Sequence, residues 1–201
     1  MIEEWFPTPI YFTDLSNIDN QILKKRAYDL KEASPSASTE WFCDTFNTLN
    51  KDYLLGNEAD KTLINLIETT GEHIYKFAKE FGLSVEKYDL VCKDFWFNIA
   101  NTGDYQEFHQ HPNNHLSAVY YVQTDKQSGD IVFKNPESIG DMFQIPNDVT
   151  TRLSHKSARY KPNESRLLIF KSNLLHMVEK NKSDKDRISI AMNFYFDRKN
   201  I

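Results

Sequence analysis

The feature that most constrains the fold of this 201-residue chain is a change of periodicity near residue 84. Before it, apolar residues recur at helical spacing over residues 18–33 and, more clearly, over residues 58–81. After it come five β-forming runs, at residues 89–100, 116–123, 130–134, 166–171 and 187–196. Helices followed by a succession of strands favour an α+β fold, with helices on one side of an antiparallel sandwich or jelly roll.

Residues with capping chemistry bound the two predicted helices. Asn17 or Asp19 precedes the first helix and Asn57 precedes the second, and such side chains accept hydrogen bonds from the first helical N–H groups. Gly82 follows the second helix, where glycine suits the left-handed conformation that commonly ends helices. These positions predict where each helix begins and ends.

The remaining segments read as an edge strand and loops. Pro7 and Pro9 confine the first β-forming stretch, residues 2–13, to a sheet edge or an irregular entry segment. Residues 34–38, SPSAS, have loop composition. Residues 135–165 are long, polar and poorly periodic, which predicts a loop, and a loop of this length in a compact domain is usually functional or mobile.

Length predicts one domain over residues 1–201, since a chain of this size buries one substantial core. We expect a helical N-terminal part, residues 1–88, and a β core over residues 89–197. The aromatic N-terminal segment leaves a homodimer open.

Charge and cysteine usage limit the partners and the compartment. The formal net charge of −5 argues against a broad basic surface for nucleic acid. Cys43 and Cys92 are far apart and lack CxxC spacing, so we expect no disulfide framework and a reducing compartment. The N-terminus lacks signal-peptide regions, and no apolar run approaches the roughly 20 residues that span a bilayer. We therefore expect a cytoplasmic protein without a membrane partner.

Two histidines close in sequence indicate half of a metal site. His109 and His111 are separated by one residue, and residues i and i+2 of an extended segment point to the same face. Pro112 then bends the chain and blocks further regular pairing. Imidazole suits iron, zinc, copper and nickel. Without context such a pair is more often incidental than metal-binding, so the site needs a third ligand from elsewhere.

His176 is the natural third ligand, because it follows the predicted strand RLLIF and distant strands lie side by side in a jelly roll. Arg187 opens the last long strand and shares a face with Ser189. A guanidinium presents a rigid fork that suits a carboxylate. The order of these residues predicts a metal with a carboxylate anchor beside it, although each taken alone is most often a core or surface residue.

The other histidines are weaker candidates. His115 follows a segment in which Pro112, Asn113 and Asn114 break the strand, so we expect a neighbour of the site or a substrate-facing group. His73 falls within a helix and His155 within the long loop, and both are expected to be structural or solvent-facing.

The order of five motifs resembles the 2-oxoglutarate/Fe(II)-dependent oxygenases. The resemblance is closer still to a prolyl-4-hydroxylase-like bacterial and phage branch with HxHP in place of the usual HxD. It covers about residues 90–196, and the WFPTPIY start also fits. The motifs are WFN at 96–98, HQHP at 109–112, LSAVYYV at 116–122, RLLIFKSNLLH at 166–176 and RISIAMNF at 187–194.

The resemblance implies a double-stranded β-helix, a cupin-like jelly roll, with the N-terminal helices packed on one face. It implies that His109 and His176 are the outer metal ligands, and that His111 replaces the usual Asp or Glu. It places Arg187 on the distal carboxylate of 2-oxoglutarate, assisted by Ser189. By the same resemblance, the cosubstrate also meets Tyr121 and Asn98.

The implied activity is a dioxygenase that binds Fe(II), 2-oxoglutarate and O₂ and hydroxylates an unknown primary substrate, with release of succinate and CO₂. No catalytic side chain is implied beyond the metal centre. In such an oxygenase, the predicted loop over residues 135–165 would act as a lid or a substrate-selecting surface. For a phage-encoded chain, the cytoplasm would be that of the host.

The chain departs from the family pattern at the metal. The common centre has two histidines and one carboxylate with open positions. Three neutral ligands leave a more positive centre, and Glu107, two residues before His109, is a fallback ligand. Ser165 and Lys171 stand where relatives tend to carry glycine and proline.

Two other functions stay open at this point. One is a cupin-type dioxygenase with three histidines that acts on a small molecule without 2-oxoglutarate. The other is a non-catalytic jelly-roll module, since fold alone does not establish function. A closed zinc site would support the module, and only His115 offers a fourth ligand for it.

Overall fold

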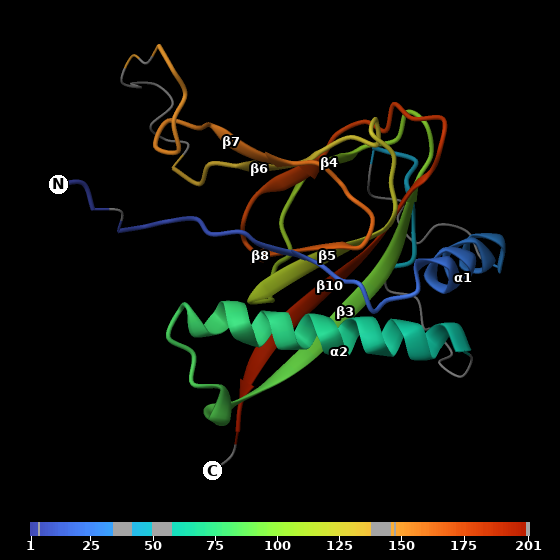
Figure 1. Ribbon diagram of the computed structural model, residues 1–201, viewed down its shortest axis with the longest axis horizontal. Helices are drawn as coiled ribbons and strands as arrows, with labels where there is room; N and C mark the ends of the chain where they lie inside the picture. The colour runs from blue at the N-terminus through green and yellow to red at the C-terminus, as the bar shows by residue number, and fades with distance from the viewer. Residues whose placement is uncertain (4, 34–41, 50–57, 138–145, 147, 200–201) are drawn as a thin grey trace.

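The computed structural model describes residues 1–3, 5–33, 42–49, 58–137, 146 and 148–199 (Figure 1). Asn57 and the 34–38 loop lie outside these ranges. The helical elements are α1 (Asn20–Ala33), α2 (Glu58–Lys79) and a 3-10 turn η1 (Val85–Lys87). The strands are β1 (Tyr11–Asp14), β2 (Phe46–Asn47), β3 (Tyr88–Ala100), β4 (Gln106–His109), β5 (Leu116–Gln123), β6 (Ile131–Lys134), β7 (Ser157–Tyr160), β8 (Arg166–Lys171), β9 (His176–Val178) and β10 (Arg187–Arg198).

The strands form two antiparallel sheets. The six-stranded sheet has the order β1-β8-β5-β10-β3-β2, and the four-stranded sheet has the order β4-β9-β6-β7. Neighbouring strands are far apart in sequence, and β10 pairs with both β3 and β5 along most of its length. The arrangement confirms the predicted jelly roll.

Alternation along β10 separates the two faces of the six-stranded sheet. Ile188, Ile190 and Met192 are fully buried on the face that contacts the helices. The residues between them, Arg187 and Ser189 among others, point to the opposite face. That face is covered by the four-stranded sheet, so it becomes the interior of the jelly roll.

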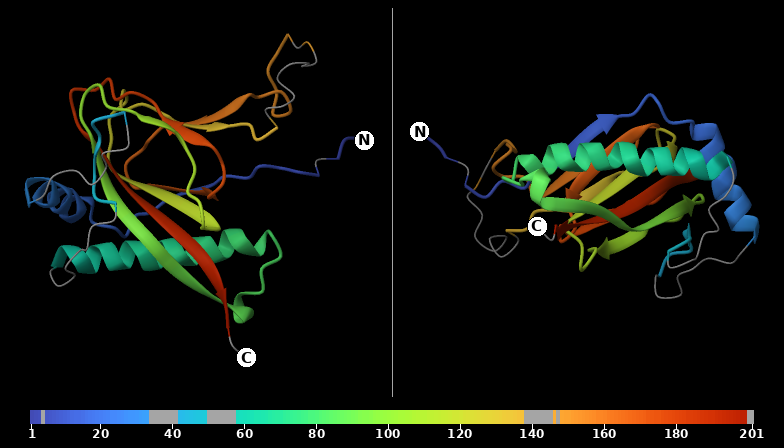
Figure 2. Two further views of the ribbon diagram at one scale, coloured as in Figure 1. Left: turned by 180° about the vertical axis from the view of Figure 1, so that it is seen from behind. Right: turned by 90° about the horizontal axis from the view of Figure 1, so that it is seen from below.

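The helices cover the outer face of the six-stranded sheet, and α2 lies across it (Figure 2). Asp19 caps α1, because its carboxylate accepts hydrogen bonds from the N–H groups of Gln21 and Ile22 at 2.9 and 3.3 Å. Gly82 ends α2 with φ of +81°, and its N–H donates to the Lys79 carbonyl. Both predicted helices and their described caps are confirmed.

A second, smaller core fills part of the jelly-roll interior. Phe170 of β8 packs against Phe133 of β6 with ring centroids 4.8 Å apart, which joins the two sheets. Tyr121 belongs to the same cluster and is 2% exposed. The apolar cluster occupies one part of the interior and leaves polar residues in the rest.

The five strands predicted from sequence are present, with small differences at their ends. β1 lies at a sheet edge, as its prolines predicted. Residues 1–88 are not purely helical, because β1 and β2 pair with the main sheet. Residues 157–160, inside the predicted loop 135–165, form β7 and pair with β6.

Candidate active site

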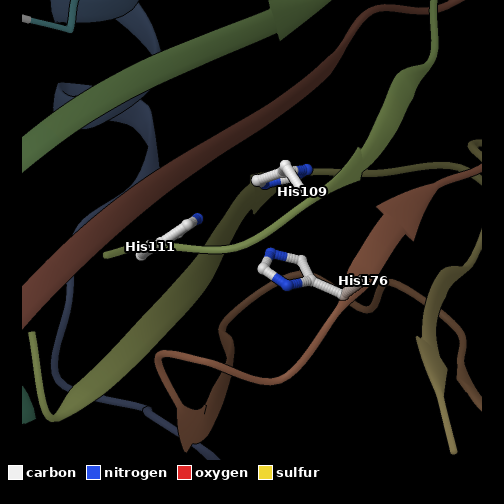
Figure 3. Close-up of side chains that lie close together, drawn as sticks. All are labelled: His109, His111 and His176. Atoms are coloured by element: carbon white, nitrogen blue, oxygen red, sulfur yellow. The ribbon is translucent and has the colours of Figure 1, made fainter. Parts of the chain in front are cut away.

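Three histidines meet inside the jelly roll (Figure 3). One ring nitrogen from each of His109, His111 and His176 lies within 4.8 Å of the other two. The Cα atoms of His109 and His176 are paired across β4 and β9, and their ring centroids are 4.2 Å apart. The His111 ring stacks on that of His109 at 5.3 Å. The sequence prediction that these three residues meet is confirmed.

Backbone carbonyls orient two of the rings. His109 Nδ1 lies 2.7 Å from the Glu107 carbonyl oxygen, and His176 Nδ1 lies 2.8 Å from that of Leu174. Because a carbonyl only accepts, Nδ1 carries the proton in both rings. Metal-binding histidines commonly donate one ring N–H in this way, which directs the lone pair of Nε2 to the ion.

A side chain orients the third ring. His111 Nδ1 lies 2.7 Å from Asn193 Oδ1, and the Ser117 hydroxyl is 3.0 Å from the same nitrogen and also donates to Asn193. His111 Nε2 is buried without a hydrogen-bond partner in the described structure. A buried polar atom without a partner costs free energy, so this nitrogen is suited to coordinate an ion.

Burial keeps the three rings neutral. Burial and, after it, the neighbouring His109 lower the pKa of His111 to about 4, a shift that the hydrogen bond with Asn193 and the charge of Asp94 partly oppose. Burial also lowers the pKa of His109, and takes that of His176 well below its usual value. Metal ions bind the neutral imidazole, so the three histidines are in the protonation state that coordinates a metal ion near neutral pH.

The fallback ligand Glu107 and the candidate fourth ligand His115 both lie outside this group. Glu107 Oε1 accepts a hydrogen bond from the Phe42 N–H at 2.6 Å, and Glu107 does not join the described metal-ligand group. His115 lines a separate hollow of about 740 Å³ near the end of α2, where its Nδ1 accepts from the Phe196 N–H. A closed four-ligand zinc site is therefore absent among the described residues.

The other two histidines are also remote from the group. His73 Nδ1 and the Tyr11 hydroxyl are 2.8 Å apart on the outer side of the sheet. His155 lines a hollow beside the N-terminal segment. Both are placed as expected.

The residues expected around the cosubstrate form a row across three neighbouring strands. Ser189 of β10 is paired with Asn98 of β3 on one side and with Tyr121 of β5 on the other. Paired residues point to the same face, and all three are at most 9% exposed. Asn98 Oδ1 is buried and lacks a hydrogen-bond partner in the described structure. Burial raises the pKa of Tyr121, so its hydroxyl stays protonated.

Arg187 lies two residues from Ser189 on this interior face and is 5% exposed. Its Nη1 donates to the carbonyl oxygens of Ser128 and Glu179 at 2.5 and 3.2 Å. Burial lowers its pKa, which Tyr121 and Asp104 partly offset. None of the described carboxylates forms an ion pair with Arg187. A buried guanidinium without an anionic partner is costly, so the site is suited to an anionic ligand.

A cavity of about 220 Å³ opens beside His109 and His111. Asp94, Trp96 and Asn193 are among the residues that line it. The sequence motifs do not mark Asp94, Asn193 or Ser117 as site residues. The alternation of side chains along a strand could have indicated two of them. Asp94 and Asn98 are an even number of residues apart, as are Asn193 and Ser189, so the members of each pair are expected on the same face.

A family model described as "Putative 2OG-Fe(II) oxygenase" matches residues 94–193, which contain all three histidines and the polar row. The chain belongs to this family. The matched region overlaps the stretch of about residues 90–196 that the sequence motifs indicated. Among curated proteins, none matches the oxygenase in sequence.

Solved structures share the fold at low identity. A prolyl-4-hydroxylase from Pseudomonas putida is 13% identical, with a TM-score of 0.59 over 94% of this chain and 93% of the other. A prolyl hydroxylase from Trichoplax adhaerens, in complex with a hypoxia inducible factor peptide, is 13% identical, with a TM-score of 0.63 over 92% and 83%. HygX from Streptomyces hygroscopicus, with nickel and 2-oxoglutarate bound, is 9% identical, with a TM-score of 0.59 over 94% and 83%.

The residues of this oxygenase fit its cofactors. Three neutral nitrogen donors, one of them buried without a partner, suit Fe(II). The buried Arg187 suits one carboxylate of 2-oxoglutarate. Among the described helices, none has the length and apolar character needed to cross a membrane.

Proposed function

We propose that this protein is a hydroxylase in which His109, His111 and His176 hold Fe(II) and Arg187 holds 2-oxoglutarate. The overall reaction converts 2-oxoglutarate, O₂ and a substrate C–H group into succinate, CO₂ and the corresponding alcohol. One oxygen atom enters succinate and the other enters the product. Bound Fe(II) supplies the activation of O₂, and the protein supplies binding, orientation and exclusion of water.

The observation that carries the proposal is the buried Arg187 in the same interior as the three histidines. The Ser128 and Glu179 carbonyls hold one edge of its guanidinium. The remaining nitrogens are then available for a bidentate bond to the distal carboxylate of the cosubstrate. Ser189 and Tyr121, paired across β10 and β5, are hydroxyl donors beside this position.

Apolar neighbours give the centre its dry surroundings. Phe170 lies 4.8 Å from the His176 ring and Trp96 lies 5.4 Å from the His111 ring, measured between centroids. Both residues are at most 7% exposed. Exclusion of water strengthens the electrostatic hold on the dianionic cosubstrate.

The same proposal places the activity in the cytoplasm. Cys43 and Cys92 are free thiols in the structure. Free thiols are typical of proteins from reducing compartments, which also preserve Fe(II).

The test compares Arg187→Ala with the wild-type protein in an assay for succinate formed from 2-oxoglutarate, Fe(II) and O₂. Truncating one partner of a buried charge interaction costs about 2–5 kcal/mol, which corresponds to an affinity for 2-oxoglutarate about 30-fold lower or more. Arg159→Ala is the control, because Arg159 is half exposed and pairs with Glu179 at the surface. Thermal melts verify that both variants fold. Equal succinate formation by Arg187→Ala and Arg159→Ala would refute the proposal.

A further inference from the structure

Asp94 gives the cavity beside the histidines a negative end. Among the described residues that line this cavity, Asp94 is the only carboxylate and none is lysine or arginine. The other polar lining consists mainly of amides: Asn47, Gln106, Gln110, Asn114 and Asn193. A cavity with this lining favours a ligand that is positively charged and donates hydrogen bonds.

A β-bulge in β3 sets the direction of Asp94. Asn193 is paired with Asp94 but the next residue of β10, Phe194, is paired with Cys92, so Lys93 is the extra residue. Before the bulge, Cys92 packs on the helix side, whereas after it Trp96 and Asp94 line the interior cavity. Bulges re-aim side chains beside active sites. Without this one, Asp94 would share the face of Cys92 and meet the apolar helix core.

The Asp94 carboxylate is not engaged elsewhere. Within the described part of the chain this carboxylate forms no ion pair; apart from the pairing of β3 with β10, Asp94 takes part only in a weak hydrogen bond from the Cys92 thiol to its backbone carbonyl. Asn114, on the same cavity, has a buried Oδ1 without a hydrogen-bond partner in the described structure. Two acceptors of the cavity therefore lack donors.

The position of Asp94 separates it from the cosubstrate anchor. On β10 its partner is Asn193, whereas Arg187 lies six residues away, which is about 20 Å along a strand. Asn193 in turn bonds the His111 ring. The negative charge of Asp94 thus lies level with His111, and the positive charge of Arg187 comes from a position six residues away along β10.

The cavity also suits a cation in size and in wall chemistry. Its volume of about 220 Å³ is below the roughly 300–1,000 Å³ of pockets for drug-sized ligands, so it accommodates a side chain or a small amine. Trp96 lines the same cavity and is 7% exposed. An indole face attracts ammonium and guanidinium groups.

We propose that the primary substrate carries an ammonium or guanidinium group, which binds Asp94 while a C–H bond of the same side chain faces the metal centre. The hydroxylation of this substrate rests on the proposed function, whereas the binding of its cationic group by Asp94 does not. Asp94 selects the substrate by charge, and Trp96 packs along the cationic group.

Binding is measured by calorimetry on protein loaded with Mn(II) and 2-oxoglutarate without O₂. The probes are N-acetyl-arginine methylamide and its neutral isostere N-acetyl-citrulline methylamide, N-acetyl-lysine methylamide and its Nε-acetylated form, and N-acetyl-glutamate methylamide. A bond to a charged group is worth about tenfold or more in affinity. We expect at least one cationic probe to bind about tenfold more tightly than its neutral partner, and the acidic probe to bind most weakly.

Variants assign that preference to Asp94. In Asp94→Asn the ratio of cationic to neutral affinity falls to about one, and in Asp94→Lys the acidic probe becomes the preferred one. Using a ratio within each variant removes any general loss of stability. Asp89→Asn is the matched control, since Asp89 lies on the same strand but pairs with Lys199 at the surface, and it retains the wild-type ratio.

The outcomes separate this inference from the proposed function. Wild-type protein that binds neutral and cationic probes equally overturns the inference, as does an unchanged ratio in Asp94→Asn, even where succinate is formed. Failure to form succinate with charge-selective binding intact refutes the hydroxylase and leaves the cation site standing. With O₂ present, we expect hydroxylation to increase the mass of the preferred probe by about 16 Da, one oxygen atom. Binding of only the acidic probe by the wild-type protein overturns the assignment of a cationic substrate.

Discussion

Gly129 lies where its own backbone approaches that of Glu179 and Lys180, close to the carbonyl groups that bind Arg187. Its φ is +82°, and a Cβ built on it would lie 2.8 Å from the Lys180 carbonyl oxygen and closer still to that of Glu179. The Glu179 carbonyl and the neighbouring Ser128 carbonyl are the two acceptors that hold Arg187. Gly129→Ala therefore tests the fold and the cosubstrate anchor together.

The expected loss of stability has two parts. A non-glycine residue in the left-handed region costs about 1–2 kcal/mol. Moving backbone to accommodate the added carbon costs a further 1–3 kcal/mol or so. Gly82→Ala isolates the first part, because Gly82 has φ of +81° and nothing within 4 Å of its built Cβ. We expect a loss of about 2–5 kcal/mol for Gly129→Ala and about 1–2 kcal/mol for Gly82→Ala.

Urea unfolding of the metal-free proteins, followed by circular dichroism, gives both free energies of unfolding. Calorimetry with Mn(II) gives the affinity for 2-oxoglutarate, which we expect to fall about fivefold in Gly129→Ala, the equivalent of one weakened hydrogen bond of about 1 kcal/mol. Gly82→Ala keeps the wild-type affinity. Equal losses of stability in Gly129→Ala and Gly82→Ala would show that the close backbone approach at Gly129 adds no cost. An unchanged affinity of Gly129→Ala for 2-oxoglutarate would refute the link between this backbone and Arg187.

Two further predictions concern His111. Asn193→Ala removes the acceptor that lies 2.7 Å from its Nδ1, and affinity for Mn(II) or Fe(II) should fall about 10- to 100-fold; a chelator competition that finds wild-type affinity would contradict this role. Because burial lowers the His111 pKa to about 4, the unfolded chain takes up the proton first, from about pH 6.5. The metal-free protein should therefore lose stability between about pH 6.5 and 4, by up to about 1.4 kcal/mol per pH unit from this residue. Urea unfolding at several pH values checks this, and an identical slope in His111→Gln would argue against it.

Local sequence chemistry predicted the long elements because their signals are contained within each segment. The helix α1 begins next to Asp19, which caps it, and α2 ends at Lys79, three residues before Gly82. The run from Arg187 alternates polar and apolar residues, and it forms the long strand β10. Such periodicity is enough to assign a helix or a strand when a segment spans several turns or pairs.

The short strands were not predictable in the same way. β2 has two residues and β9 has three, which is too short for a periodic pattern. They are strands because distant partners, β3 for one and β4 and β6 for the other, supply the hydrogen bonds. Residues 157–160 likewise looked like loop until β6 paired with them.

The candidate site shows the same division. The spacing of His109 and His111 and the shared face of Arg187 and Ser189 follow from the period of a strand, which the sequence contains. That His176 pairs with His109, and that Glu107 is held by Phe42 instead of joining the metal ligands, follows from tertiary contacts.

Within regular stretches of strand, the sequence determined which residues share a face, whereas the tertiary structure decided where a bulge at Lys93 interrupts that alternation and what covers each face. A strand with polar residues on one side has the same pattern whether that side meets water or a second sheet. The sequence therefore did not single out Asp94 or Asn193, and it is the pairing of β3 with β10 and the contact of Asn193 with His111 that bring them beside the histidines. The physical reason is that alternation is a property of the local backbone, whereas burial depends on segments that are distant in sequence.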